Sequence, residues 1–472
     1  MARKSKPLII DQASVIDIDS KGRGVVKHDE LVIFVKDTCP GDVIKLRTTR
    51  KRKSYYEGVV EEIISPSEAR QEPFCKHFED CGGCKLQHIS YEDQLKFKEK
   101  QVHDAIERIA KIPFSNYDPI LACENTTFYR NKLEFSASHR RWISYADAKS
   151  NEDIDTSEAI GFHVPGRFDK IVHVEKCHFQ PDPSNAIRNF VHQYAKDESI
   201  DFYDLYKHQG SLRTVMIRNN KAGDFMVVLM VSSTGLDFGK KCLETVYDKF
   251  SEVKSASLLV NDKVNDSFYD IDAQLICGSP FITETIGDLT FNVDAKSFLQ
   301  TNTDQTLLLY QLAEKYAGLQ GDEVVYDLFC GVGTIGLFLS KKCKEVIGIE
   351  TVPEAIIKAK ENAVNNGIEN VRFETGSVEH VLSDDFKSKY PRPDVVITDP
   401  PRMGMHQKVI DGLLEMLPEK IVYVSCNPST QARDIALLAE RYDLSKLQPV
   451  DMFPHTPHVE SVALLTLRTS NH

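Results

Sequence analysis

The sequence lacks the hydrophobic runs of a membrane protein. Its longest apolar stretches, such as residues 226–231, are far shorter than the roughly 20 residues that a membrane-spanning helix needs. No apolar segment follows the positively charged start of the chain, so we expect no secretory signal peptide. With 41% hydrophobic and 27% charged residues, the chain has the balance of a globular protein. We therefore expect a cytoplasmic protein without a membrane partner.

Positive charge is in the minority. The chain has 58 Lys and Arg against 70 Asp and Glu, a formal net charge of −12. Taken alone, this balance speaks against a general nucleic-acid-binding protein. The basic residues are unevenly distributed, however, since residues 45–53 hold six Lys and Arg and no acid. An acidic protein still binds RNA when its basic residues share one face, so RNA is not excluded as a partner.

The length of 472 residues predicts two or three domains. Residues 1–66 contain about five short strand-like runs separated by turns such as residues 21–24 and 39–42, a pattern that favours a small OB-like β-barrel. Residues 65–67, Ser-Pro-Ser, are typical of a linker. The first expected domain is therefore an all-β module of 1–66.

Residues 67–290 form the expected central domain, which is mostly β with a helix near 184–196. Residues 91–112 have helical spacing, and we expect this helix to pack either within the central domain or on the following one. Four apolar residues of this segment have the spacing to share one face of the helix: Leu95, Val102, Ile106 and Ile109.

Residues 291–472 form the expected third domain. A helix at 306–316 is followed by a strand, a glycine loop, a helix, a strand and another helix. This alternation indicates βαβ units around a mainly parallel, Rossmann-like sheet. The fold class is therefore α/β plus β.

A glycine-rich loop follows the first strand of the third domain. The run 324–329 leads into Cys-Gly-Val-Gly-Thr-Ile-Gly at 330–336, and we expect a helix at 337–342. Glycines allow a tight turn and the close approach of a ligand. The next strand ends in Glu350, near the spacing of about 20 residues at which a carboxylate binds ribose hydroxyls in dinucleotide folds.

Two cofactors suit this loop. Its glycines match G-x-G-x-x-G, which keeps a nicotinamide cofactor open. An acid before the loop, Asp327, and Asp399-Pro400-Pro401-Arg402 after a later strand at 394–398 favour S-adenosylmethionine instead. A glycine turn without any ligand is the remaining alternative.

Two further residues are candidates for chemistry. A strand at 421–424 leads into Ser425-Cys426-Asn427-Pro428, and ligands bind at the carboxyl ends of strands in open α/β sheets. Cys426 is therefore expected beside the cofactor, where a thiolate is a good nucleophile when positive groups lower its pKa. Glu460, between the loop 454–459 and a strand at 461–467, can point into the same cleft. A buried structural cysteine and a solvated glutamate are the alternatives.

Four motifs occur in one order along the chain: Asp327-Leu328-Phe329-Cys330-Gly331, Asp399-Pro400-Pro401-Arg402, Ser425-Cys426-Asn427-Pro428 and His458-Val459-Glu460. Together they resemble the RNA uracil-5 methyltransferases of the RumA/TrmA type, over essentially the whole chain. The resemblance implies that Cys426 is the nucleophile and Glu460 the base. It also implies four S-adenosylmethionine contacts: Gln300, Phe329, Glu350 and Asp399.

The residue types fit that chemistry. C5 of uracil is a poor nucleophile, and addition of the Cys426 thiolate at C6 would make it enolate-like. C5 could then take the methyl group from S-adenosylmethionine, and Glu460 would remove the C5 proton. The target base must leave its stack to reach such a pocket.

Eleven cysteines in a chain without an export signal are better read as thiols, metal ligands or nucleophiles than as disulfides. Cys75-x5-Cys81-x2-Cys84 supplies three thiolates, and either Cys177 or Cys123 supplies a fourth. Four thiolates suit zinc or an iron–sulfur cluster. The resemblance to the RumA-like branch implies a [4Fe–4S] cluster on Cys75, Cys81, Cys84 and Cys177. Methyl transfer moves no electrons, so a structural or RNA-positioning role is expected.

The N-terminal barrel resembles a TRAM domain, an RNA-binding module. Residues 45–53, with Tyr55 and Tyr56 beside them, offer phosphate contacts and stacking surfaces, although such a run also suits a solvated face. Residues 128–132 match a family segment near the RNA, with Arg130 as a candidate contact.

The RNA substrate follows from the same resemblance. The transfer RNA enzymes of the TrmA type lack the barrel and the cysteines, so the chain lies nearer the 23S ribosomal RNA enzymes. Transfer RNA uracil-5 methylation, RNA cytosine-5 methylation and a non-catalytic RNA-folding role are the alternatives. We expect a monomer.

Overall fold

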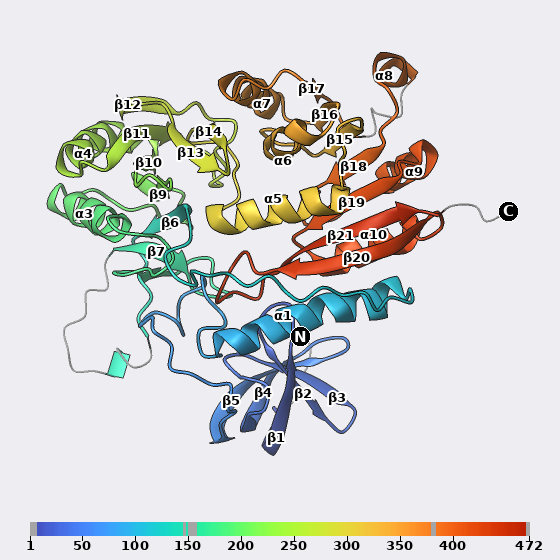
Figure 1. The fold of residues 1–472 in the computed structure, drawn as a ribbon. Helices are drawn as coiled ribbons and strands as arrows, with labels where there is room; N and C mark the ends of the chain where they lie inside the picture. The colour runs from blue at the N-terminus through green and yellow to red at the C-terminus, as the bar shows by residue number, and fades with distance from the viewer. Residues whose placement is uncertain (1–6, 145–147, 150–157, 379–383, 469–472) are drawn as a thin grey trace.

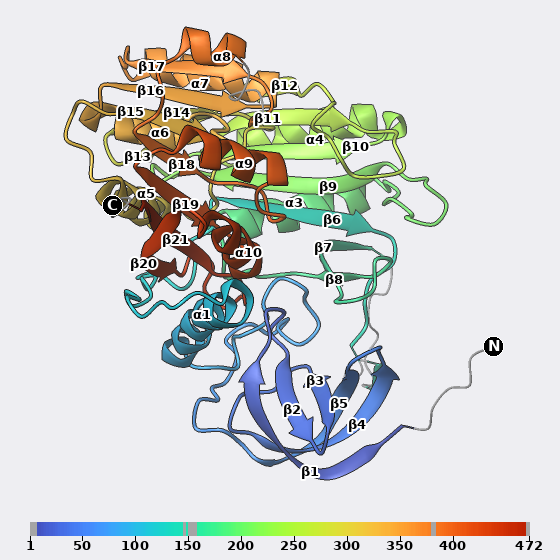
Figure 2. The same ribbon diagram turned by 90° about the vertical axis from the view of Figure 1, so that its right-hand side faces the viewer.

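The computed structural model describes residues 7–144, 148–149, 158–378 and 384–468. Within these residues the chain forms a closed barrel, two seven-stranded sheets and a separate two-stranded hairpin (Figure 1). The barrel lies at one end of the molecule and the two large sheets lie together at the other (Figure 2). None of the described helices is long and apolar enough to cross a membrane.

The N-terminal segment forms a closed five-stranded barrel, which confirms the sequence-based expectation. Its strand order is β1-β2-β3-β5-β4, and β4 closes it by pairing with both β1 and β5. The strands are β1 Ile9–Ile18, β2 Gly24–His28, β3 Leu31–Val35, β4 Val43–Lys51 and β5 Tyr56–Ser65. Alternate residues point inward, and eight form the core: Ile10, Ala13, Val15, Val26, Ile33, Val35, Ile44 and Leu46.

The basic run 45–53 lies mostly on β4, and the barrel itself neutralises part of it. Three of its cations pair with carboxylates of the same barrel: Lys45 with Asp11, Arg47 with Glu61 and Arg52 with Glu57. Arg50, Lys51 and Lys53 stay exposed. The barrel therefore presents less positive charge than its sequence indicates.

The predicted helix over 91–112 is present as α1 Tyr91–Ala105 and a π-helical turn, Ile106–Ala110. Its buried face differs from the expectation: Ile109 is 42% exposed, whereas Ala110 is buried. A π turn rotates less per residue than an α turn, which carries Ala110 rather than Ile109 onto the core side. The first part of α1 buries two polar residues, Gln94 and Lys98.

Helix α1 lies between the barrel and the C-terminal sheet (Figures 1 and 2). Toward the barrel, Lys100 pairs with Asp17 of β1 at 2.7 Å. Toward the sheet, Val102, Ala105 and Ile106 belong to the same hydrophobic core as the C-terminal strands and helices. The helix thus joins the first and last parts of the chain.

The central sheet has the order β12-β11-β10-β9-β6-β7-β8. Two helices pack against one of its faces, and the other face shares a core with the β13–β14 hairpin and α5. Strand β10 is buried along its whole length, which explains its continuous apolar sequence. Its strands and helices are β6 Lys132–Ser138, β7 Ala159–His163, β8 Ile171–His173, α3 Ser184–Asp197, β9 Leu212–Asn219, β10 Phe225–Val231, α4 Leu236–Lys249, β11 Val253–Val260 and β12 Gln274–Gly278.

The C-terminal sheet has the order β17-β16-β15-β18-β19-β21-β20. Strands β15 to β19 are parallel. Strand β21 lies between β19 and the edge strand β20 and runs antiparallel to both. Its helices cover both faces, so Val325 packs with α5 while Tyr326 packs with α1, α9 and α10. The elements from the hairpin onward are β13 Ile282–Ile286, β14 Leu289–Val293, α5 Thr303–Ala317, β15 Val324–Leu328, α6 Thr334–Leu339, β16 Glu345–Glu350, α7 Pro353–Asn365, β17 Val371–Thr375, α8 Asp384–Lys389, β18 Val395–Thr398, α9 Gln407–Met416, β19 Lys420–Ser425, α10 Pro428–Leu438, β20 Tyr442–Val450 and β21 Glu460–Leu467.

The helix after the glycine loop begins earlier than predicted. The sequence placed it at 337–342, whereas α6 spans Thr334–Leu339 and continues as a short 3-10 turn, Ser340–Lys342. Gly333 has a φ of 82° and turns the chain directly into the helix. The glycine loop is therefore shorter and closer to the sheet than expected.

Candidate active site and cysteine site

The glycine loop joins the carboxyl end of β15 to α6. Gly331 and Gly333 both have positive φ, at 54° and 82°, and Phe329 shares this left-handed conformation at 64°. A Cβ atom at Gly333 would lie 2.7 Å from the ring of Phe373, so only glycine fits there. The loop is thus held close to β16 and β17, with its main chain facing the carboxyl edge of the sheet.

Two carboxylates hold the loop in place. Asp327 Oδ2 accepts a hydrogen bond from Gly336 N at 2.8 Å, and Glu350 Oε2 accepts one from Gly331 N at 3.2 Å. Burial raises the pKa of Asp327 to about 7, and its Oδ1 has no hydrogen-bond partner among the described residues. An orphaned, buried carboxylate oxygen beside a glycine loop fits a cofactor that brings a donor, such as the amino group of S-adenosylmethionine.

Three of the predicted cofactor contacts meet at the carboxyl edge of the sheet. Phe329 and Asp399 directly follow β15 and β18, which pair side by side, and Asp399 N donates to Leu328 O at 3.4 Å. Glu350 ends β16, the neighbour of β15 on the other side. The motifs that lie far apart in the sequence are thus brought to one place by parallel strand pairing.

The fourth predicted contact, Gln300, lies outside the sheet, just before α5. Asn131 Nδ2 donates to the main-chain O of Gln300 at 2.9 Å and to Thr303 Oγ1 at 3.0 Å. Farther along α5, Tyr310 donates through its hydroxyl to Thr334 Oγ1 in the glycine loop at 2.7 Å. The central sheet and the glycine loop therefore both fix the segment that carries Gln300.

Cys426 and Glu460 come together through an antiparallel ladder. Strand β19 ends at Ser425, which pairs with Ser461 near the beginning of β21. Cys426 directly follows Ser425, and Glu460 directly precedes Ser461. In an antiparallel pair the next two partners are therefore Cys426 and Glu460. Glu460 is 3% exposed. The structure thus places the predicted nucleophile and base side by side.

Burial and neighbouring charge set the protonation of this group. Burial, then the negative charges of Glu460 and Asp399, raise the pKa of Cys426 to about 11. Burial and the charge of Asp399 raise the pKa of Glu460 to about 8, and burial raises that of Asp399 to about 7. In the free protein, the thiol and the Glu460 carboxyl are therefore mainly protonated at neutral pH.

Arg402 is the cation of this group, and sequence reasoning gave it no role. Its charge lowers the pKa of both Cys426 and Glu460. Its main-chain O accepts hydrogen bonds from Asn427 Nδ2 at 2.9 Å and Thr430 Oγ1 at 3.3 Å, which ties the loop after β18 to the residues after Cys426. The signal was present in the sequence, since Arg402 belongs to the Asp-Pro-Pro-Arg motif.

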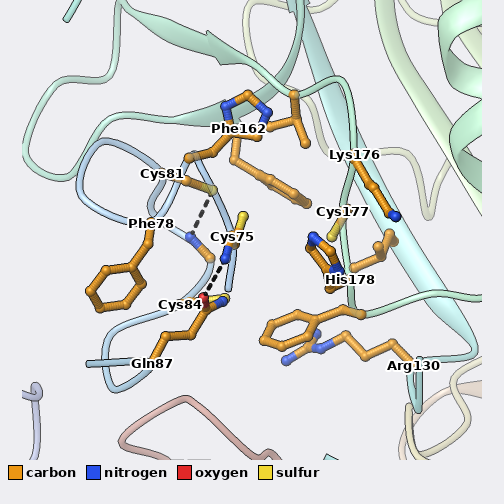
Figure 3. A pocket seen from close by; sticks show the side chains of 15 residues that line it. Cys75, Phe78, Cys81, Cys84, Gln87, Arg130, Phe162, Lys176, Cys177 and His178 are labelled. Atoms are coloured by element: carbon orange, nitrogen blue, oxygen red, sulfur yellow. Dashed lines mark hydrogen bonds between the residues drawn. The ribbon is translucent and has the colours of Figure 1, made fainter. Parts of the chain in front are cut away.

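The four predicted metal-binding cysteines line one cavity of about 80 Å³, away from Cys426 (Figure 3). Burial raises the pKa of each thiol, that of Cys81 to about 12 and that of Cys84 well above its usual value, and the charges of Cys177 and Cys75 add to the shift of both. Gln87 Nε2 donates to Cys84 Sγ at 3.1 Å. Cys123 does not line this cavity; its thiol donates to Asn125 O.

A buried cation lies beside these thiols. Arg188 is fully buried, and its charge lowers the pKa of Cys177. Its Nη2 donates to Glu175 O at 2.7 Å, whereas Nε and Nη1 have no hydrogen-bond partner among the described residues. Arg188 does not line the cavity itself, and its guanidinium lies 4.7 Å from the ring centroid of Phe135, so its link to the cysteines is its charge acting on Cys177. Within the described ranges, no group of three or more His, Cys, Asp or Glu is arranged to hold a metal ion.

Arg130 lies between the cysteine cavity and the candidate active site. It lines the cavity, and its guanidinium lies 5.4 Å from the ring centroids of both Phe179 and Phe453. Phe453 belongs to the loop that leads to Glu460. The segment that the sequence placed near RNA is therefore in contact with the cysteine cavity and with the loop before Glu460.

The comparisons with known proteins agree with this geometry. The family model described as tRNA (Uracil-5-)-methyltransferase matches residues 275–468, which include all of the C-terminal sheet. An uncharacterized RNA methyltransferase of Bacteroides thetaiotaomicron is 45% identical over 452 residues, covering 95% of this chain and 100% of that protein. Another from Porphyromonas gingivalis is 44% identical over 96% of this chain and 99% of its own length.

One solved structure is similar over nearly the whole chain. The tRNA (uracil-54, C5)-methyltransferase of Pyrococcus abyssi, in complex with S-adenosyl-L-homocysteine, has a TM-score of 0.76 and 28% identity. The match covers 96% of this chain and 99% of that one. The likeness therefore includes the barrel and the central sheet as well as the C-terminal sheet. The chain belongs to the RNA uracil-5 methyltransferases, enzymes that take the methyl group from S-adenosylmethionine.

Proposed function

We propose that this enzyme methylates C5 of a uridine in 23S ribosomal RNA through a covalent adduct between Cys426 and C6 of the uracil. The observation that carries the proposal is the placement of Cys426 across the β19–β21 ladder from Glu460, at the sheet edge that holds the glycine loop. A nucleophile and a base at the cofactor edge of the sheet are the two groups that this reaction needs.

Cys426 acts as the nucleophile. Because burial and two carboxylates raise its pKa to about 11, the thiol must lose its proton to solvent when the substrate binds. Arg402 favours the thiolate, as does any loss of negative charge at Glu460 or Asp399. The thiolate then bonds to C6, and the electron pair of the C5–C6 double bond moves toward C5 and the O4 carbonyl.

Glu460 acts as the base. S-adenosylmethionine would supply the methyl group to C5, with the bond from methyl to sulfur breaking and S-adenosylhomocysteine leaving. The Glu460 carboxylate then takes the proton from C5, the C5–C6 double bond forms again, and the bond between C6 and Cys426 Sγ breaks with its electrons returning to sulfur. Burial beside Asp399 raises the pKa of Glu460 to about 8, which suits a group that must accept a proton near neutral pH.

Four residues contact the cofactor in this proposal: Gln300, Phe329, Glu350 and Asp399. Glu350 already holds Gly331 N, so one carboxylate both shapes the glycine loop and faces the ligand. The unpartnered Asp327 Oδ1 supports a cofactor with a hydrogen-bond donor at the same place.

Cys75, Cys81, Cys84 and Cys177 would hold a [4Fe–4S] cluster. The support is their common cavity and the buried, partly unpartnered Arg188 beside Cys177, because four thiolates and a cluster carry net negative charge. Zinc bound by four thiolates is the alternative. Lying next to Arg130 and the loop before Glu460, the cluster would have a structural role.

The barrel, as a TRAM-like module, would contact RNA through the exposed Arg50, Lys51 and Lys53. Transfer RNA is the second candidate substrate, favoured by the whole-chain likeness to the Pyrococcus abyssi transfer RNA enzyme. The two are separated by mapping 5-methyluridine in both RNA classes from cells with and without the gene. Loss of the modification from 23S RNA alone supports the proposal; loss from transfer RNA alone replaces it with the second candidate.

The adduct has its own test. RNA that carries 5-fluorouridine at the mapped position has no C5 proton to remove, so the adduct cannot resolve. With S-adenosylmethionine present, a denaturation-stable protein–RNA complex linked through Cys426 is expected, and Cys277→Ser serves as the matched control because Cys277 lies on β12, outside the site. Absence of a complex, with both ligands shown to bind, contradicts the covalent mechanism.

A further inference from the structure

The loop that leads to Glu460 is held by residues from distant parts of the chain. This base loop, residues 451–459, connects β20 to β21, and Glu460 is the first residue of β21. Glu460 is the first residue of its strand, so the main chain before it belongs to the base loop. The conformation of the base loop therefore determines the position of Glu460. Contacts that hold the base loop in place therefore also hold Glu460 in place.

His455 lies at the centre of the base loop and is 3% exposed. Its φ of 62° is in the left-handed region, which is uncommon for residues other than glycine, although asparagine, aspartate and histidine adopt it more often than the rest. Such a conformation persists only where surrounding contacts over-determine it. The contacts of His455 are therefore the contacts that hold the loop.

Gln94 of α1 supplies two of these contacts, although it is 361 residues away in sequence. Gln94 Oε1 accepts a hydrogen bond from His455 N at 2.9 Å. Its Nε2 lies 3.1 Å from His455 Nδ1 and donates to Leu86 O at 3.0 Å and Ile89 O at 2.8 Å. Gln94 is fully buried, so these hydrogen bonds are shielded from water.

The cysteine loop ends on the same residue. Lys85 N and Leu86 N, directly after Cys84, both donate to His455 O, at 3.0 and 3.1 Å. The main chain of His455 is thus held on its N–H by α1 and on its carbonyl by the segment that carries the cysteines. One residue joins both of these elements to the base loop.

Other residues hold the remaining carbonyls of the loop. Lys98, one turn after Gln94, donates to Phe453 O at 3.0 Å, and Tyr129 donates through its hydroxyl to Pro454 O at 3.0 Å. Three consecutive residues of the base loop are thereby anchored from outside it. The two buried polar residues of α1, Gln94 and Lys98, are therefore buried because they bind this loop.

We propose that Gln94 is a positioning residue for Glu460, acting through His455 and the base loop. The inference rests on the proposed role of Glu460 as the base that resolves the Cys426 adduct. Gln94 touches neither substrate nor cofactor in this proposal. Its removal should therefore slow the step in which C5 loses its proton and leave adduct formation intact.

The test uses the full-length enzyme with Gln94→Met, which keeps the side-chain volume and removes all four hydrogen bonds. On RNA with ordinary uridine, turnover is expected to fall about tenfold or more, and a denaturation-stable protein–RNA complex should accumulate. On RNA with 5-fluorouridine, which needs no proton removal, the trapping rate should stay within about twofold of the unaltered enzyme. Lys96→Met, on the solvent side of α1, should change none of these.

A second variant guards against misfolding. Tyr129→Phe keeps the ring, removes the hydrogen bond to Pro454 O and should shift the same ratio of turnover to trapping in the same direction. If turnover and trapping fall together and no complex accumulates, Gln94 is only structural and the proposal is wrong.

Glu460→Gln is the reference that separates the two proposals. If Glu460→Gln accumulates the complex and Gln94→Met does not, only the positioning role fails. If Glu460→Gln accumulates no complex, the role of Glu460 as base fails, and with it the foundation of this inference.

Discussion

The carboxyl group of Glu460 lies close enough to the thiol of Cys426 for its negative charge to raise the pKa of that thiol. Because burial already has the same effect, the pair is held in its protonated form in the free protein. In the proposed mechanism, the positive charge of a bound sulfonium beside this pair would favour the ionised forms of both groups.

The pH dependence of the reaction should report Glu460. Its pKa of about 8 predicts an inflection in kcat/KM near pH 8, since the base must be ionised, below the further rise expected as the Cys426 thiol ionises near 11. Asp399→Asn removes a negative charge that raises this pKa and should move the rise to lower pH. Arg402→Met removes a positive charge that lowers it and should move the rise to higher pH. The measurement is methyl transfer to RNA at limiting RNA, across the pH range.

The control for these shifts is Asp443→Asn, an exposed carboxylate on β20 that should leave the midpoint unchanged. A midpoint that moves in neither Asp399→Asn nor Arg402→Met would show that another group governs the profile.

Removal of the nucleophile should abolish catalysis. Cys426→Ala is expected to reduce methyl transfer by at least about a thousandfold, because no other group can open the C5–C6 double bond. Binding of S-adenosylmethionine should be retained, since the predicted cofactor contacts lie on other strands. Transfer of labelled methyl groups and equilibrium binding measure the two quantities. Residual activity near that of Cys277→Ser would exclude Cys426 as the nucleophile.

The buried pair of Lys98 and Asp451 should be important for stability. Lys98 Nζ lies 2.6 Å from Asp451 Oδ1, and both side chains are shielded from solvent. Lys98→Met leaves the Asp451 carboxylate buried without its cation, which costs about 3–5 kcal/mol of unfolding free energy. Denaturant unfolding measures this value.

The matched control for Lys98→Met is Lys100→Met on the same helix. Lys100 pairs with Asp17 and Asp104 at the surface, where an ion pair contributes about 0–1 kcal/mol. Equal unfolding free energies for the two variants would show that the buried pair contributes no more than an exposed one.

Iron content should distinguish the cysteines. Protein prepared without oxygen is expected to contain iron and sulfide and to absorb broadly in the visible range. Cys177→Ser should lose most of the iron, whereas Cys123→Ser should keep it, because Cys123 does not line the cavity. Loss of iron from both variants, or zinc in place of iron, would contradict the cluster.

The sequence predicts the edge of the C-terminal sheet well, for a physical reason. Glycine loops, acids and Cys426 directly follow apolar strands, and parallel pairing then brings strand ends together without further information. It does not predict that β21 inserts between β19 and β20, because strand order depends on long-range packing. The position of Glu460 across from Cys426 therefore needed the structure or the family resemblance.

The polar contacts of α1 were missed for another reason. Apolar periodicity finds faces lined with Leu, Val and Ile, so it gives no signal for buried polar residues such as Gln94 and Lys98. Their burial depends on partners such as His455 and Asp451, more than 350 residues later in the chain. No local pattern carries that information, and the same holds for Arg188 beside Cys177.

The central sheet and the C-terminal sheet do not have separate interiors. Met226 and Val228 of β10 belong to the same hydrophobic core as Val325 of β15 and Val422 of β19. A hinge movement between the two sheets would expose that core to water. We therefore expect the two sheets to keep the same relative position when RNA binds. In the proposed reaction, the uracil would then have to leave its stack to reach Cys426, which favours target uridines in loops that open easily.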